Sequence, residues 1–227
     1  MFNKIIILLL LLFLFFILNF SFKENFDTKK YDALIISPGG GGTTYFLEYL
    51  NNHTNLKYND IHDKDGLKHM SFNKENKINN VNCDKIIYIY SDPKLAIDSH
   101  YRRKWPKQQL LKLGDPYHLK NTNNDINIFK NSVIEKNRDM YGIEKQFYFF
   151  LNNRNLNKKI LFIDFYNITN TKNKIANFLN IDKHLLDGLS INKRESTYND
   201  NEPPEYIEIY KNLYEKMKQY DGYIKKN

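Results

Sequence analysis

Two places where an apolar strand runs directly into a helix constrain the fold of this chain more than any other feature of its sequence. The first joins the apolar segment 33–37, through a loop with four consecutive glycines, to a helix beginning at Thr43. The second joins the apolar segment 85–90 to a helix beginning at Pro93. Strands that alternate with helices predict an α/β domain with a central parallel sheet and helices on both faces. Because ligands of such sheets bind at the carboxyl ends of the strands, both junctions lie where a ligand is expected.

The remaining segments continue this alternation. We predict strands over 33–37, 85–90 and 159–164, and helices over 43–51, 93–103, most of 128–151, 172–180 and from Pro203-Pro204 onward. In the last helix, apolar residues share one face at Ile207, Tyr210, Leu213, Tyr214 and Met217. Turn signals between 105 and 125 predict an irregular, lid-like stretch.

The glycine loop has the composition of an anion-binding turn. Glycines allow positive φ and close approach to a ligand, and the N–H groups of the first helical turn then point at one anion. Thr43 and Thr44 add hydroxyl donors. The alternative is a flexible turn without a ligand. A Walker A loop is disfavoured, because that motif ends in Gly-Lys-Ser/Thr and the lysine is missing here.

The order of the two junctions resembles the sulfotransferase family, which uses 3′-phosphoadenosine 5′-phosphosulfate (PAPS) as the sulfuryl donor. Gly42-Thr-Thr44 matches the Gly-Thr-Thr of the family's 5′-phosphosulfate loop, and Tyr45 stands where an aromatic residue is common. Ser91-Asp-Pro93 takes the place of the family's Arg-Asp-Pro, and Ser99 falls eight residues after Ser91. In the family, that Arg and Ser hold the 3′-phosphate. Segments 141–151, 159–168 and 175–181 resemble the family's later helix, strand and helix.

This resemblance implies a fold, an activity and a set of site residues. The implied fold is a P-loop-like three-layer domain with a central parallel sheet. The implied activity is transfer of a sulfuryl group from PAPS to a hydroxyl of a glycan or other acceptor, without a metal. The residues implied to bind the donor are Gly40, Gly41, Gly42, Thr43, Thr44, Tyr45, Ser91, Ser99, Arg102 and Arg103.

Two cations of the family pattern are missing. Gly40 or Gly41 stands in place of the loop lysine, and Ser91 stands in place of the arginine. Each loss removes a charge-assisted hydrogen bond worth about 1.5–3 kcal/mol. Arg102 and Arg103 are candidate substitutes; alternatively they form a solvated basic helix end. The second function that the sequence allows is therefore a catalytically degenerate member, acting as a membrane-tethered binding or scaffold protein.

The family's catalytic base, a His or Glu, comes between the first helix and the second motif. This interval contains His53, His62 and His69, with three aspartates at 60, 63 and 65. We predict His69 as the base and Lys68 as a cation beside it; the alternative is that these are polar loop residues. No pair of histidines has HExxH spacing and there is no cysteine cluster, so no metal site is predicted.

The N-terminus predicts a membrane anchor. Residues 5–18 are an unbroken apolar run that two phenylalanines extend to 22, close to the length that crosses a bilayer. A small-residue cleavage site is absent, so an uncleaved signal anchor over 1–22 is favoured over a signal peptide. We predict a stem over 23–30 and a sulfotransferase-like domain over 31–227, facing a Golgi- or ER-type lumen or another extracytoplasmic space.

The chain is basic, with 34 Lys and Arg against 26 Asp and Glu. This balance suits an anionic donor and an anionic acceptor. The basic residues are scattered and no zinc-finger or RNA-recognition signature is present, so nucleic acid is not a predicted partner. The single cysteine, Cys83, can form no intrachain disulfide and is expected to be a small buried hydrophobe.

Overall fold

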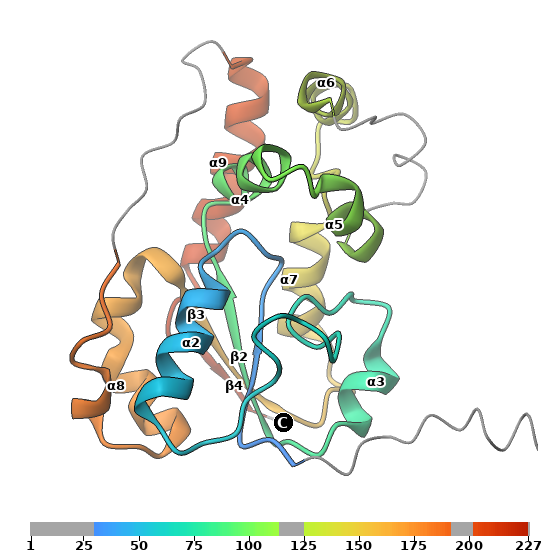
Figure 1. Ribbon diagram of the computed structural model, residues 1–227. Helices are drawn as coiled ribbons and strands as arrows, with labels where there is room; N and C mark the ends of the chain where they lie inside the picture. The colour runs from blue at the N-terminus through green and yellow to red at the C-terminus, as the bar shows by residue number, and fades with distance from the viewer. Residues whose placement is uncertain (1–29, 114–124, 192–201, 227) are drawn as a thin grey trace, which may run out of the picture.

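The computed structural model describes residues 30–113, 125–191 and 202–226 (Figure 1). Its centre is a four-stranded sheet in the order β1 (Leu34–Ile36), β2 (Lys85–Tyr90), β3 (Lys159–Asp164) and β4 (Ile224–Lys225). The first three strands are parallel, as predicted, but β4 pairs antiparallel with β3. The prediction of a purely parallel sheet was therefore wrong at one edge, where a two-residue strand returns after the last helix and makes the sheet mixed.

Helices cover both faces of this sheet, so the domain has three layers (Figure 1). One face carries α2 (Thr43–His53) and α8 (Ile168–Leu179), followed by a short 3₁₀ helix, η3 (Lys183–Leu186). The other face carries α3 (Glu75–Asn80), α4 (Pro93–Arg102), α5 (Pro106–Leu113), α6 (Ile126–Lys136), α7 (Ile143–Asn152) and α9 (Pro204–Lys218). The predicted α/β class with helices on both faces is thus confirmed.

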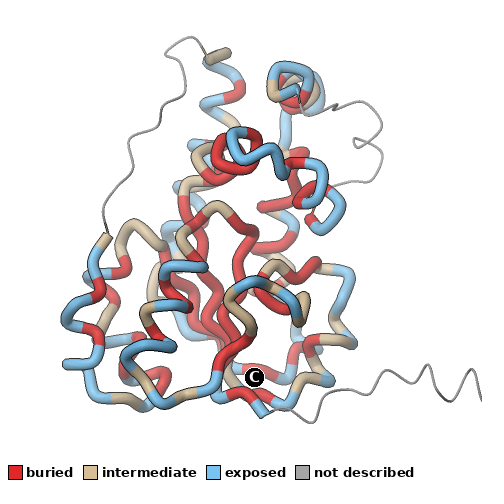
Figure 2. Tube along the Cα trace, viewed as in Figure 1, coloured by how far each residue is buried: buried red, intermediate tan, exposed pale blue. Residues whose placement is uncertain are grey.

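Alternation along the strands divides the core in two. In β2, Ile86, Tyr88 and Tyr90 pack into the core on the α4–α7–α9 face, while Ile87 and Ile89 pack into the core on the α2–α8 face. This is the two-residue period of an extended chain, with both faces covered. All five side chains have no exposed surface, and buried residues fill the middle of the molecule (Figure 2).

The structure corrects three helix predictions. Residues 106–113, expected to be irregular, form α5, which begins at Pro106, a residue that suits the first position of a helix. The helix predicted over 128–151 is two helices, because Asn137 ends α6 in the left-handed conformation (φ 48°) and Gly142 begins α7 at φ 88°. Helix α8 begins at Ile168 rather than at Lys172, and Ile168 is buried against the sheet.

The last helix begins where it was expected, with Pro203 as its N-cap residue, but one residue of its buried face differs. Tyr206 is fully buried, whereas Ile207 is exposed. Tyr210, Leu213 and Met217 are buried, as the apolar spacing predicted. The buried stripe starts at Tyr206, which is four residues before Tyr210 and packs edge-on against its ring, with 5.1 Å between ring centroids.

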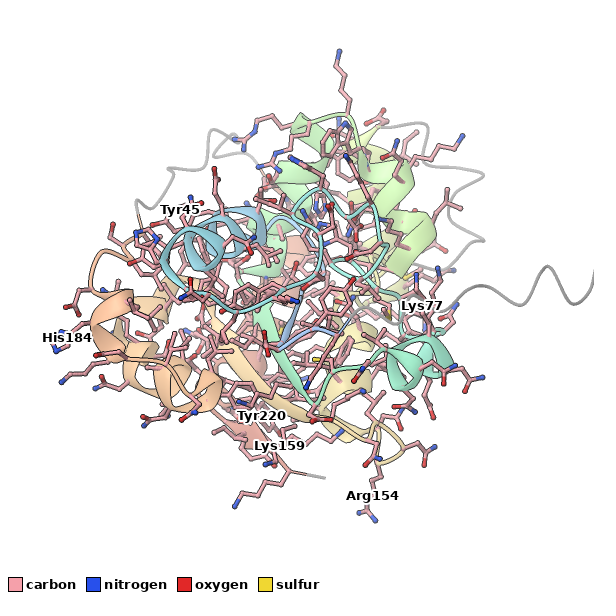
Figure 3. All side chains as sticks on the ribbon, turned by 60° about the horizontal axis from the view of Figure 1, so that its bottom comes forward. Tyr45, Lys77, Arg154, Lys159, His184 and Tyr220 are labelled. Carbon is pink, nitrogen blue, oxygen red and sulfur yellow. The ribbon has the colours of Figure 1, made fainter. Side chains whose placement is uncertain are left out.

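Basic side chains are spread over the surface. Arg154, Lys159 and His184 are exposed and point outward at separate places (Figure 3). Within the described ranges, no helix is both long and apolar enough to span a bilayer. The predicted anchor, 1–22, and the predicted stem, 23–30, lie outside these ranges except for Lys30, and so does most of the predicted lid.

Candidate functional site

An open cavity of about 980 Å³ lies beyond the carboxyl ends of β1 and β2, where the two sequence junctions meet. It is bounded by the glycine loop and the first turn of α2 on one side and by α4 and α5 on another. The loop 61–69, Phe165, Tyr166 and residues 190–191 complete its wall. Of the residues predicted from the sequence, those that line it are Gly40, Gly42, Thr43, Thr44, Tyr45, Lys68, His69, Ser99, Arg102 and Arg103.

The glycine loop needs its glycines for two reasons. Gly40 and Gly42 have φ values of 73° and 75°, a region that side chains rarely adopt. Neighbouring elements also approach closely: a Cβ on Gly40 would lie 2.7 Å from the Cα atom of Ala96, and one on Gly42 would lie 2.0 Å from the ring of Phe165. The loop is therefore a packed and defined turn rather than a flexible one.

The start of α2 leaves donors open to the cavity. Its N-cap residue, Gly42, offers no side-chain acceptor, so the first-turn N–H groups receive no capping hydrogen bond from it. Thr43 is buried, and its hydroxyl donates to Ser37 Oγ over 2.5 Å, which engages one of the two predicted hydroxyl donors. Tyr45 is exposed and its hydroxyl donates to the carbonyl of Ser190 over 2.7 Å.

A lysine from another loop reaches the glycine turn. Lys68 Nζ donates to Thr44 Oγ1 over 3.2 Å and to the carbonyl of Ile61, and its side chain is only 5% exposed. Burial lowers the pKa of Lys68, while the nearby carboxylates of Asp63 and Asp60 oppose that change. An ammonium group has three donors, so one N–H of Lys68 remains beyond these two contacts.

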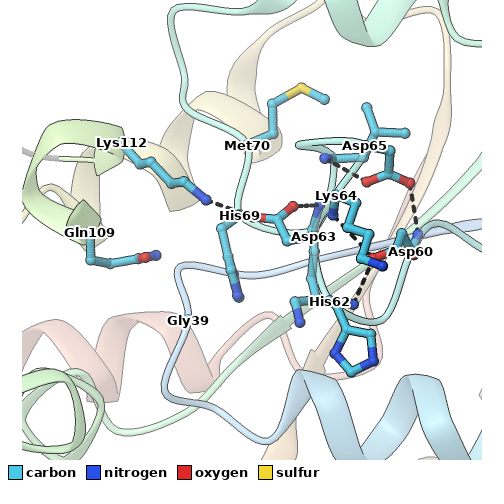
Figure 4. A network of polar contacts seen from close by, with 12 residues as sticks. Gly39, Asp60, His62, Asp63, Lys64, Asp65, His69, Met70, Gln109 and Lys112 are labelled. Carbon is cyan, nitrogen blue, oxygen red and sulfur yellow. Dashed lines mark hydrogen bonds and ion pairs between the residues drawn. The ribbon is translucent and has the colours of Figure 1, made fainter. Parts of the chain in front are cut away.

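His69 faces the glycine loop from the same segment (Figure 4). Its Nδ1 lies 3.3 Å from the carbonyl oxygen of Ser37 and 3.4 Å from Ser37 Oγ. Donation of Nδ1–H to that carbonyl leaves Nε2 with a free lone pair. Burial lowers the pKa of His69 to about 4, although the Asp63 carboxylate acts in the other direction. The imidazole is therefore neutral at pH 7, with one ring nitrogen unprotonated.

Asp63 holds this segment to α5. It accepts a hydrogen bond from Lys112 Nζ over 2.6 Å and one from the backbone N–H of Lys68 over 2.9 Å (Figure 4). Burial by itself would raise the pKa of Asp63, but the hydrogen bond from Lys112 and the neighbouring positive charges hold it below its ordinary value. The carboxylate thus ties the backbone of Lys68 to α5.

The predicted 3′-phosphate residues divide into two groups. Ser99, Arg102 and Arg103 line the cavity from the last turns of α4. Ser91 does not: it is 3% exposed, and its Oγ lies 2.9 Å from the point that a Cβ on Gly41 would occupy. No described residue gives Ser91 Oγ a hydrogen-bond partner. Gly41 is likewise buried behind the cavity wall.

Several cavity residues were not predicted, among them four polar ones from α4 and α5. Gln109 and Lys112 lie one helical turn apart on α5. They were missed because no helix was predicted there; a predicted helix would have put both residues on one face. Asp98 and His100 come from α4 on either side of the predicted Ser99. Asp98 is 4% exposed and bonded to Lys94 over 3.2 Å, while its Oδ1 has no partner among the described residues.

Comparisons of the chain with protein-family models, with curated proteins and with solved structures found no match. Among the described residues, no three His, Cys, Asp or Glu side chains are grouped so that they could hold a metal ion. What the site offers chemically is therefore read from its own groups. These are a helix start without a side-chain cap, a buried cation beside it, a neutral imidazole with a free nitrogen, and two arginines at the end of α4.

Proposed function

We propose that this chain is a sulfotransferase that moves the sulfuryl group of PAPS to a hydroxyl of a glycan or other acceptor. The observation that carries the proposal is the contact of Lys68 Nζ with Thr44 Oγ1 at the start of α2. The glycine loop lacks the lysine of the sulfotransferase pattern, and Lys68 supplies a cation at this turn from a different loop. On this proposal the sheet is the P-loop-like sheet of that family.

The chemistry follows from the groups in place. His69 Nε2 accepts the proton of the acceptor hydroxyl, whose oxygen attacks the sulfur atom. The bond between sulfur and the bridging phosphate oxygen breaks, giving a sulfate ester and adenosine 3′,5′-bisphosphate. Lys68 and the first-turn N–H groups of α2 stabilise the negative charge that grows on the departing 5′-phosphate. Because these groups are already fixed by Asp63 and Thr44, little reorganisation is needed at the moment of transfer.

The proposal gives the 3′-phosphate its partners in the same cavity. Ser99 and Arg102 lie one turn apart in α4, Arg103 is its C-cap residue, and all three line the cavity. We assign the 3′-phosphate to these residues, in place of the arginine that Ser91 replaces. The proposal also places the chain in a membrane through 5–22, with the catalytic domain on the extracytoplasmic side.

One observation favours the second candidate, a degenerate binding or scaffold protein. Ser91 stands where the family pattern has its arginine, and it is buried behind Gly41 without a hydrogen-bond partner among the described residues. A site that depends on Arg102 and Arg103 alone holds the 3′-phosphate with exposed side chains, which lose more conformational entropy on binding.

The experiment that decides between the two is transfer of label from ³⁵S-PAPS, using the full chain in a mild detergent and a panel of desulfated glycans. We expect labelled product with the wild type and its loss in His69→Ala and Lys68→Met. The matched control is Lys158→Met, since Lys158 is also 5% exposed but donates to the carbonyl of Val81, away from the cavity. Nucleotide binding without any transfer, to glycan or to water, would leave only the scaffold candidate.

A further inference from the structure

A second histidine, on a different element from His69, lies at the glycine loop. His100, on α4, is 5% exposed and lines the cavity. Its Nδ1 lies 2.9 Å from the hydroxyl of Tyr141, and the two rings are nearly parallel, with 5.5 Å between their centroids. The imidazole is thus held by one hydrogen bond and one stacked ring, and only its other nitrogen is left for a ligand.

The Tyr141 hydroxyl determines which nitrogen of His100 carries the proton. Tyr141 has no exposed surface, and burial raises the pKa of its phenol far above the ordinary value, so the O–H is retained. His100 Nδ1 is its hydrogen-bond partner in the structure, and a buried O–H that donates to nothing is costly. Tyr141 therefore donates to Nδ1, and the proton of the neutral imidazole is on Nε2.

That Nε2–H group of His100 lies beside Gly39, in space that is open because glycine has no side chain. A Cβ on Gly39 would lie 2.8 Å from His100 Nε2 and 2.9 Å from Gln109 Nε2. Gln109 in turn donates to the carbonyl of Pro38 over 2.6 Å, which fixes the approach of α5 to the same turn. Two nitrogen donors from α4 and α5 thus occupy the space that any larger residue at 39 would fill.

We propose that His100 is a neutral hydrogen-bond donor to the oxyanion held at the glycine loop, and that His69 is its counterpart, with the opposite tautomer and a free acceptor nitrogen. The nature of the anion, a phosphate or sulfate ester, rests on the proposed function. One imidazole gives a hydrogen bond and the other takes a proton, so the pair divides acid and base roles without a second charged group.

The surroundings of His100 keep it uncharged. Burial, the neighbouring His69 and the positive charge of Arg103 together lower its pKa to about 3. A neutral donor still strengthens its hydrogen bond as negative charge grows on the oxygen that it faces. It also adds no further positive charge to a cavity that Lys68 and Arg103 already line, where another cation would be repelled.

The first test needs no nucleotide. Long-range ¹H–¹⁵N spectra of the full chain at neutral pH report which ring nitrogen of each histidine is protonated, with His69→Gln and His100→Gln identifying the signals. We expect a protonated Nε2 in His100 and a protonated Nδ1 in His69. In Tyr141→Phe, His100 should become a mixture of tautomers. A protonated Nδ1 in wild-type His100 would overturn the inference.

The second test uses inorganic sulfate as the probe, followed through the amide signals of the glycine loop. His100→Leu should weaken sulfate binding about tenfold, while His100→Gln, which keeps an N–H donor, should stay within about threefold of the wild type. His184→Leu is the matched control, since that side chain is 71% exposed at the outer edge of the molecule (Figure 3). Equal sulfate affinity in wild type and His100→Leu, or no sulfate binding at all, would refute the donor role.

Parallel titrations with adenosine 3′,5′-bisphosphate separate this inference from the proposed function. Sulfate binding that depends on His100, without any nucleotide binding, would remove the sulfotransferase proposal and leave the donor role standing. Nucleotide binding that is unaffected in His100→Leu would remove the donor role of His100 and leave the sulfotransferase proposal standing. If His100→Leu fails to fold, the wild-type tautomers and the Tyr141→Phe variant still decide the matter.

Discussion

The depressed pKa of His100 predicts that acid destabilises this protein through one identifiable residue. The imidazole is 5% exposed on α4, and burial, His69 and Arg103 lower its pKa to about 3, whereas an unfolded histidine titrates near its ordinary value of 6.5. The folded state therefore binds fewer protons than the unfolded state between these two values. The stability that depends on neutral His100 is fully present above pH 6.5 and is lost progressively as pH falls toward 3.

The magnitude follows from linkage. Between about pH 8 and about pH 5, the unfolded histidine takes up its proton while the folded one does not, which costs about 2 kcal/mol of unfolding free energy. His69, whose pKa is lowered to about 4, adds a similar loss over the same range. Asp98, whose pKa burial raises, acts in the opposite direction at lower pH, so the total slope mixes several groups.

The assay isolates His100 by a double difference. Urea unfolding of the wild type and of His100→Gln, followed by far-ultraviolet circular dichroism at both pH values, gives the change in unfolding free energy on acidification for each protein. We expect that change to be smaller by about 2 kcal/mol in His100→Gln. His184→Gln, an exposed histidine, should keep the wild-type change. Identical changes in the wild type and His100→Gln would refute the claim that His100 is held neutral.

Two further predictions concern packing. Gly42→Ala should lower the unfolding free energy by about 2–5 kcal/mol, because a Cβ at a φ of 75° meets the ring of Phe165, and Phe165→Leu should recover part of the loss in thermal melts. Tyr210→Phe should cost about 1–3 kcal/mol, because it removes the 2.9 Å hydrogen bond to buried Asp139. Tyr206→Phe should be neutral or stabilising, because no described residue pairs with its buried hydroxyl, and equal losses in the two tyrosine variants would contradict this.

The strands could be predicted from the sequence because burial on both faces leaves a simple pattern. The segments 85–90 and 159–164 were predicted with the bounds that the structure gives to β2 and β3. Helix α5 was missed because the turn signals that suggested an irregular stretch fall at 114–124, outside the described residues, whereas 106–113 contains no glycine. The short strand β4 has only two residues, too few to show any period.

The site was harder to predict than the fold, because its contacts join residues far apart in sequence. Lys68 was predicted as a cation beside the base, but its contact with Thr44 crosses 24 residues of chain that no spacing rule covers. No sequence pattern pointed to His100, because its proposed role depends on the hydrogen bond with Tyr141, 41 residues later, and on the lack of a side chain at Gly39. Of the two motif serines, Ser99 lines the cavity from α4, whereas Ser91 lies buried behind the loop.

The measurement that tests the central claim most directly is calorimetric titration of adenosine 3′,5′-bisphosphate into the full chain in a mild detergent. The account predicts micromolar binding, about −8 kcal/mol, and a loss of about 1.5–3 kcal/mol in Lys68→Met, with Lys158→Met unchanged. Absence of binding up to millimolar nucleotide, or equal affinity in the wild type and Lys68→Met, would contradict the claim that Lys68 supplies the cation of a donor site at the glycine loop.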